Sequence, residues 1–99
     1  MSGRASAARE LAALEAVFKA LAHAQRRQIL LVLHYRGGEM SAGEIASRFE
    51  CSWPTTTRHL GVLEEAGLVH VEPRGRERVY RLDAARLDDV AGRWLARFR

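Results

Sequence analysis

The stretch from Ser41 to Gly67 constrains the fold most, because it holds two helical patterns separated by only three residues. The first pattern, SAGEIASRF, places Ile45, Ala46 and Phe49 at helical spacing. The second, WPTTTRHLGVLEEAG, follows directly after the tripeptide ECS. Two short amphipathic helices joined by a tight turn are typical of a helix-turn-helix. We therefore predict that motif over residues 41–67.

Local signals mark where both helices begin and end. Ser41 and Glu44 match a capping box, in which side chains and backbone N–H groups bond reciprocally at a helix start. Ser52 is the expected N-cap of the second helix, and Pro54 lies in its first turn, where a proline's missing N–H is harmless. Gly67 is the natural end of this second helix, since glycine readily adopts the left-handed conformation of a helix terminus.

The second helix, over residues 52–66, is expected to bury Thr56, Leu60 and Leu63 and to expose a polar face. The residues that we expect at a DNA surface are Ser52, Trp53, Thr55, Thr57, Arg58 and His59. Hydroxyl, guanidinium and imidazole groups hydrogen-bond base edges, and threonine methyls can contact the methyl group of thymine. An ordinary solvent-exposed helix is the alternative, but threonine is a poor helix former to repeat three times there. The pattern favours DNA reading.

Length and charge suit a small binding module. The 99 residues are expected to form a single domain over 1–99, and the apolar content of 47% rules out global disorder. A net charge of +4 suits a polyanionic partner. Fifteen of the sixteen basic residues are arginine, a bias that a GC-rich genome would produce by itself, so the placement of the arginines says more than their number.

The sequence also indicates a compartment. No apolar run approaches the roughly 18 residues of a membrane helix, so no membrane partner is expected. The beginning of the chain, MSGRASAARE, lacks the apolar core of a signal peptide. A single cysteine allows no internal disulfide, which fits a reducing environment. We therefore expect a cytoplasmic protein.

Two more helical patterns precede the motif. Residues 25–35 form the second of them, which Gly37 and Gly38 should end, and residues 39–40 allow only a short bridging strand. The first pattern covers residues 5–22, with apolar side chains at intervals of three and four: Leu11, Leu14, Val17, Phe18 and Leu21.

After the motif, residues 68–82 change from a helical period to a period of two. LVHVE, a turn at PRGR and then ERVYRL predict a β-hairpin. A basic hairpin directly after a recognition helix is typical of the wing of a winged helix, which contacts phosphates beside the groove. A hairpin tip whose charges only protect a sheet edge is the alternative. The expected wing contacts are Arg74, Arg76 and Arg78, which with Arg81 oppose the single acid Glu77 and give residues 73–81 a net charge of +3.

The last helical pattern, over about residues 84–98, suggests how the protein assembles. A winged helix can close its core without two further amphipathic helices, so those at 5–22 and 84–98 leave an apolar surface that a monomer cannot hide. We expect a homodimer, whose two-fold axis would present two recognition helices to one palindrome. The expected interface residues are Leu11, Leu14, Phe18, Leu87, Val90, Trp94, Leu95 and Phe98. The predicted fold is mainly α, a winged helix-turn-helix of five helices and a β-hairpin.

Taken in order, these segments resemble the arsenic-repressor-type (ArsR) family of bacterial winged-helix regulators, near its small autorepressors. The similarity covers about residues 11–98 and is carried by FKALAHAQRRQILLVL, SAGEIASRF, PTTTRHLGVLEEAGLV and RGRERVYRL. It implies a homodimer that binds an operator, usually represses, and dimerises through its first and last helices. The positions that match the family's DNA-reading residues are Thr55, Thr57, Arg58 and His59, with wing contacts at Arg74, Arg76 and Arg78.

The chain departs from the family where many members bind metals. The cysteine pair that such members carry at the start of the first motif helix is replaced here by MSAGE. Others bind ions between paired C-terminal helices, but residues 83–98 contain Asp83, Asp88 and Asp89 and no histidine. The four histidines of the chain are scattered at positions 23, 34, 59 and 70. We therefore expect no metal site and no cofactor, and the sequence identifies no inducer.

Three other functions compete with that of a DNA-binding repressor. Cys51 lies just before the recognition helix, where oxidation would disturb DNA contact, so a redox-responsive repressor is one alternative. A winged helix that binds a protein instead of DNA is another. An enzyme is the third, but the sequence shows no Ser/His/Asp or Cys/His grouping, no phosphate-binding glycine loop and no metal-ligand cluster. We therefore expect no catalytic activity.

Overall fold

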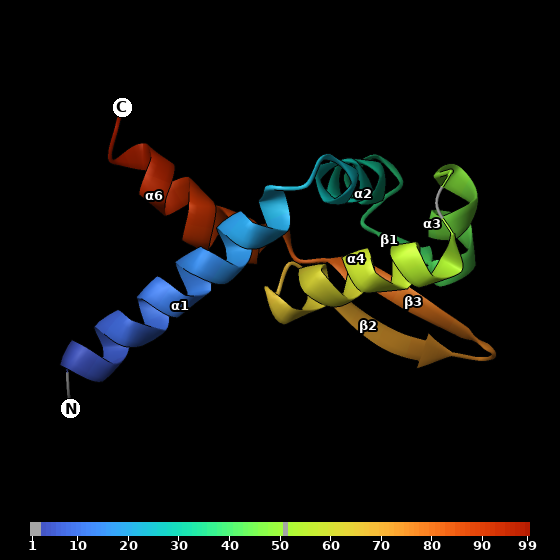
Figure 1. Ribbon diagram of the computed structural model, residues 1–99, viewed down its shortest axis with the longest axis horizontal. Coiled ribbons are helices and arrows are strands. Elements are labelled where there is room, and N and C mark those ends of the chain that lie inside the picture. The colour runs from blue at the N-terminus through green and yellow to red at the C-terminus, as the bar shows by residue number, and fades with distance from the viewer. Residues whose placement is uncertain (1–2, 51) are drawn as a thin grey trace.

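The computed structural model describes residues 3–50 and 52–99. The molecule is elongated, with extents of 43 × 30 × 24 Å. Figure 1 shows α1 and α6 together at one end of the long axis and the tip of the β2–β3 hairpin at the other. The elements are α1 (Gly3–Leu21), α2 (Ala24–Tyr35), β1 (Glu39–Ser41), α3 (Ala42–Arg48), α4 (Trp53–Glu65), β2 (Val69–Arg74), β3 (Glu77–Leu82), α5 (Ala84–Leu87), the π-helix η1 (Asp88–Gly92) and α6 (Arg93–Ala96).

Both helices of the predicted helix-turn-helix begin where the local signals place them. Ser41 accepts a hydrogen bond from the Glu44 backbone N–H while the Glu44 carboxylate accepts one from Ser41 N–H, so the capping box is confirmed. Ser52 is the N-cap of α4 and accepts from the Thr55 backbone. Gly67 follows the helix with a φ of 75°, and its N–H and that of the next residue bond back to the last turn of α4. This Schellman arrangement confirms the predicted helix end.

The three strands form one antiparallel sheet in the order β1-β3-β2, so β2 is an edge strand. The hairpin differs from the prediction, because Pro73 and Arg74 belong to β2 and the turn contains only Gly75 and Arg76. A proline fits an edge strand, since its missing N–H faces no partner there. Gly75 supplies the positive φ, 65°, that a tight two-residue hairpin turn requires.

The C-terminal segment is helical, as predicted, but it is not a regular α-helix. Asp83 caps its start by accepting from the Arg86 N–H, and a π-helical turn over Asp88–Gly92 separates α5 from α6. Within the described residues the three pieces follow one another without a break, so they count as the fifth predicted helix. The helix ends at Ala96, two residues before the predicted boundary.

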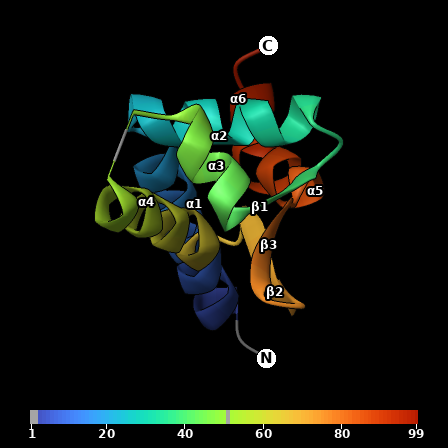
Figure 2. The ribbon, with the colours of Figure 1, turned by 90° about the vertical axis from the view of Figure 1, so that its right-hand side faces the viewer.

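The core lies between the sheet and the helices α2, α3 and α4, and the second half of α1 closes it. Figure 2 shows α2 lying across the top of the molecule, with α4 and the sheet beneath it. Within the described ranges, no helix is long and apolar enough to cross a membrane. The largest side chains with almost no exposed surface are Ile29, Leu33, Ile45, Leu60, Leu63, Leu68, Val17, Val69 and Thr56.

Candidate nucleic-acid interface

The recognition helix α4 has one buried and one exposed face, largely as predicted. Thr56, Leu60 and Leu63 are buried. Thr57 and Arg58 are exposed, and no ion pair joins Arg58 to any described residue. Three further predicted contacts lie at the start of the helix, where Ser52 and Trp53 are exposed and Thr55 is half-buried. Trp53 is 56% exposed and presents a large aromatic residue at the start of the helix.

His59 is the exception, and the expectation that its side chain lies on the exposed face of the helix is wrong. This residue is only 7% exposed, and its side chain lies against the start of α2. Its Nδ1 lies 3.3 Å from Nη1 of Arg26, and its ring centroid lies 4.4 Å from that of His23. The spacing 56, 59, 60, 63 is that of a single helical face, so the sequence itself contained the signal for burial.

The wing is less basic than its own residues suggest. Arg74 donates to Glu39 of β1 at 2.6 Å and to Glu72 at 2.9 Å, and Arg81 lies 3.7 Å from Glu72. Hydrogen bonding to Arg74 lowers the pKa of the Glu39 carboxyl, and the same contacts raise the pKa of the Arg74 guanidinium. The predicted net charge of +3 counted residues 73–81 alone and therefore missed both carboxylates.

Arg76 and Arg78 are the cations that the wing leaves available. Both are exposed, and neither forms an ion pair within the described part of the chain. Arg76 lies in the two-residue turn at the tip, and Arg78 follows it on β3. Figure 1 shows this tip and the first turn of α4 both directed away from the terminal helices. α4 therefore presents the exposed hydroxyl of Thr57 and the guanidinium of Arg58, and the hairpin presents the guanidinium groups of Arg76 and Arg78.

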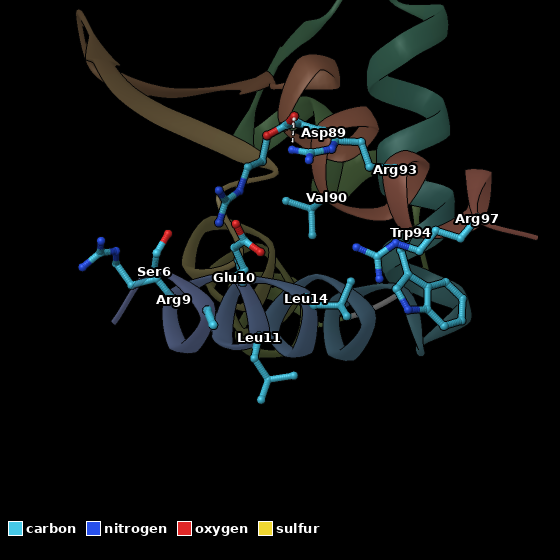
Figure 3. A pocket seen from close by; sticks show the side chains of 13 residues that line it. Ser6, Arg9, Glu10, Leu11, Leu14, Asp89, Val90, Arg93, Trp94 and Arg97 are labelled. Atoms are coloured by element: carbon cyan, nitrogen blue, oxygen red, sulfur yellow. Dashed lines mark ion pairs between the residues drawn. The ribbon is translucent and has the colours of Figure 1, made fainter. Parts of the chain in front are cut away.

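At the opposite end of the molecule, a groove of about 460 Å³ lies between α1 and the C-terminal helix. Figure 3 shows Leu14 and Val90 pointing into this groove from its two sides. Trp94 also lines the groove, and its ring packs edge to face against that of Phe18 at a centroid distance of 5.2 Å.

The eight predicted interface residues divide into two groups in this structure. Phe18, Leu87 and Val90 pack partly against the core of their own chain, and Leu14 and Trp94 are half-buried. The other three remain largely uncovered: Leu11 is 60% exposed, Leu95 49% and Phe98 72%.

Known proteins are similar to this chain in sequence and in architecture. Residues 21–72 match the family model described as a helix-turn-helix domain. The transcriptional repressor SdpR of Bacillus subtilis is 37% identical over 82 residues, which are 83% of this chain and 88% of the repressor. The solved structure of an ArsR-like transcriptional regulator from Rhodococcus has a TM-score of 0.74 and 37% identity, covering 89% of this chain and 80% of that one. This chain belongs to the ArsR family of transcriptional regulators.

A further ArsR-family neighbour adds information on assembly. The winged helix-turn-helix DNA-binding domain of a possible ArsR-family regulator from Mycobacterium bovis was solved as a homodimer. It is 29% identical, with a TM-score of 0.75, and the match covers 97% of this chain and 86% of that domain. The family and the fold are those of DNA-binding transcriptional regulators and not of enzymes, as predicted.

Two of the predictions for this ArsR-family chain concern positions where ligands or oxidants would act. Cys51, the predicted redox position, lies outside the described residues. Among the residues that are described, no three His, Cys, Asp or Glu side chains gather as metal ligands would. The prediction that no metal is bound still awaits a direct test.

Proposed function

We propose that this protein is a homodimeric repressor that reads a palindromic operator with α4 and holds the adjoining DNA backbone with its wing. The observation that carries the proposal is that the polar groups suited to DNA and the exposed apolar side chains of the terminal helices lie at opposite ends of the molecule. α4 carries exposed Thr57 and Arg58, and the hairpin carries exposed Arg76 and Arg78, which form no ion pair with any described residue. Figure 1 shows the first turn of α4 and the hairpin tip directed away from the apolar terminal helices. A two-fold dimer formed at the apolar end would leave both polar ends free to meet one DNA duplex.

Different roles follow for the exposed groups. A guanidinium in the major groove donates two hydrogen bonds to guanine, and each such bidentate contact discriminates against the wrong base by about 1–3 kcal/mol. We assign this role to Arg58, with Thr57 beside it. Arg76 and Arg78 at the wing would neutralise phosphates, which adds affinity without sequence preference. Arg74 is held by two carboxylates and would have to leave them before it could contribute.

The proposed dimer interface comprises the exposed apolar side chains of the terminal helices. Burial of Leu11, Leu95 and Phe98 from both copies would remove a large apolar area from water, and the solved homodimer of the Mycobacterium bovis relative supports assembly of this kind. Because its proposed partner is DNA, we place the action of the protein in the cytoplasm.

The test begins with genomic fragments that the purified protein retains, which are sequenced to obtain the operator. Arg58→Ala should weaken operator binding by about 1–3 kcal/mol and relax base preference at one position of each half-site. Arg76→Ala should weaken all sequences alike and reduce the salt dependence by about one unit for each phosphate that the variant no longer neutralises. Arg4→Ala, which removes the same charge from the exposed first turn of α1, should change neither property.

A protein-binding winged helix is the rival function, and the same assay separates the two. A DNA reader shows salt-sensitive binding with a preferred sequence. If no fragment is enriched at any salt concentration, the rival is favoured. If Arg58→Ala loses affinity uniformly on all sequences, the assignment of base reading to this residue is wrong. Repression itself is measured by transcription from a promoter that carries the retained operator.

A further inference from the structure

Arg26, in the first turn of α2, contacts two other helices at once. Its Nε donates to the carbonyl of Ala20 at 2.9 Å and its Nη2 to the carbonyl of Lys19 at 3.0 Å. Both carbonyls lie in the last turn of α1, where a positive charge is favourable, and that of Lys19 also accepts from the Ala22 N–H. The third nitrogen, Nη1, lies 3.3 Å from Nδ1 of His59 in α4. One planar guanidinium therefore joins the end of α1 to the recognition helix.

The contact with His59 specifies the protonation of that imidazole. A guanidinium only donates hydrogen bonds, so Nδ1 of His59 must accept and its proton must lie on Nε2. The groups in contact with this ring are Arg26 and His23 before α2, and the exposed Arg58 is its neighbour in the chain on α4. Burial, followed by the charges of these neighbours, lowers the pKa of His59. The imidazole is therefore neutral at neutral pH, as the contact requires.

We propose that Arg26 is a positioning residue, which sets the orientation of the recognition helix relative to α1 through its contact with His59. α1, α2 and α4 all touch one another, so a rotation of α4 against α1 would strain this junction directly. The inference deepens the proposed function and rests on it in one respect. If α1 forms part of a two-fold interface, its angle to α4 determines the distance between the two recognition helices, and hence the half-site spacing that the dimer accepts.

The neighbouring Arg27 provides a matched control. Its Nη1 donates to the Leu21 carbonyl at 2.8 Å, so it also caps the end of α1. No contact joins it to α4 among the described hydrogen bonds and ion pairs. Arg27→Leu therefore removes a capping cation and leaves the link to α4 intact, whereas Arg26→Leu removes both.

The first measurement needs no DNA. Residual dipolar couplings of the backbone amides in α1 and α4 report the angle between the two helices in the purified protein. Arg26→Leu should change the mean angle between α1 and α4 or widen the range of angles that the protein samples. Arg27→Leu should leave the angle as in the parent. His59→Phe keeps a ring and the α1 contacts but removes the acceptor, so it tests the link even if Arg26→Leu does not fold. An unchanged angle in folded Arg26→Leu or His59→Phe would overturn the inference, whatever DNA binding shows.

The second measurement uses the retained operator and duplexes with one base pair inserted between the half-sites. Arg26→Leu should bind the original spacing about tenfold or more weakly, because it loses a charge-assisted hydrogen bond, and should discriminate less between spacings. Arg27→Leu should stay within about threefold of the parent. If Arg26→Leu keeps both its affinity and its spacing preference, the positioning role is wrong. If the angle changes in Arg26→Leu but the parent protein binds no DNA fragment, the proposed function is wrong, whereas the role of Arg26 in orienting α4 relative to α1 still holds.

A pH profile distinguishes positioning from general packing. Protonation of His59 would place two cations 3.3 Å apart, so operator affinity of the parent should fall as the pH drops from 8 to 5. His59→Asn retains an acceptor near Nδ1 but does not titrate. Its affinity should be close to that of the parent at pH 8, and the ratio of the two affinities should diverge on acidification. A constant ratio across this range would contradict the required neutral acceptor.

Discussion

Phe98 offers the sharpest test of how the chain assembles. Its ring is 72% exposed and lies 4.9 Å from the Trp94 ring, so it covers little of the core of its own chain. Full burial of a phenylalanine side chain is worth about 1.5–3 kcal/mol, and the uncovered share corresponds to about 1–2 kcal/mol per copy. Two-fold symmetry doubles the loss in Phe98→Ala to about 2–4 kcal/mol, which raises the dimer dissociation constant about 30- to 700-fold.

Sedimentation velocity across a concentration series measures this constant, with circular dichroism to verify that the monomer remains folded. Tyr35→Ala is the matched control, because Tyr35 is 78% exposed on α2, outside the terminal helices. It should leave the dimer constant within about threefold of the parent value. A dimer that Phe98→Ala does not weaken, or that Tyr35→Ala weakens equally, would refute an interface built on the C-terminal helix.

Four further expectations follow from the structure and the sequence. Gly67→Ala should cost about 1–2 kcal/mol in urea unfolding, because a side chain at a φ of 75° is strained and its Cβ would lie 3.1 Å from Arg86 Nε. Gly61→Ala, with nothing within 4 Å of the new Cβ, should instead stabilise the protein by about 0.5–1 kcal/mol. If both substitutions change the free energy of unfolding in the same direction, this account is wrong. Thr56→Val should stabilise by about 1 kcal/mol, because the buried Thr56 hydroxyl has no hydrogen-bond partner among the described residues, and a loss of stability would reveal one. The hydrogen bond from the Ser41 N–H lowers the pKa of the Glu44 carboxyl. The stability that the ionised Glu44 contributes is therefore fully present above the ordinary pKa of 4.5 and is lost as the pH falls through the lowered pKa. Glu44→Gln should flatten that acid limb in a series of unfolding curves, and an unchanged limb would assign it to other carboxyls. Operator binding should not change with stoichiometric zinc, nickel, cadmium or arsenite under reducing conditions, since one thiol and four scattered histidines make a poor donor set. A tenfold loss of affinity by titration with any of these ions would show that ligands from two subunits converge.

Local sequence signals predicted the boundaries of elements well, because caps and turns are decided within a few residues. Ser41, Ser52 and Gly67 each bond to backbone groups at most five positions away, so no knowledge of the rest of the chain was needed. The π-helical turn at Asp88–Gly92 lies beyond such signals. The periodicity of residues 84–98 describes a helix, but not a local change in the number of residues per turn.

Two residues of the predicted site, His59 and Arg74, have partners that the sequence did not reveal, and the reason is the same for both. The imidazole of His59 suits base edges and so predicts an exposed position, although its spacing from Thr56 and Leu63 is that of a buried stripe. The charge of the hairpin predicts that Arg74 is an available cation, yet its partner Glu39 lies 35 positions earlier. The chemical type of a side chain shows that it could contact DNA. Whether it is available depends on partners from distant segments of the chain.

The sequence by itself determined the winged helix-turn-helix, the polar face around Thr57 and Arg58, and a basic hairpin after the recognition helix, because hydrophobic period, caps and turn residues act over short distances. Only the tertiary structure decided which cations remain available. The strand order β1-β3-β2 places Glu39 and Arg74 in one sheet, where they pair, whereas Arg76 and Arg78 form no ion pair among the described residues. Packing of three helices likewise places Arg26 between α1 and His59. Ion pairs and buried hydrogen bonds depend on contact in space, and no sequence spacing specifies which distant residues meet.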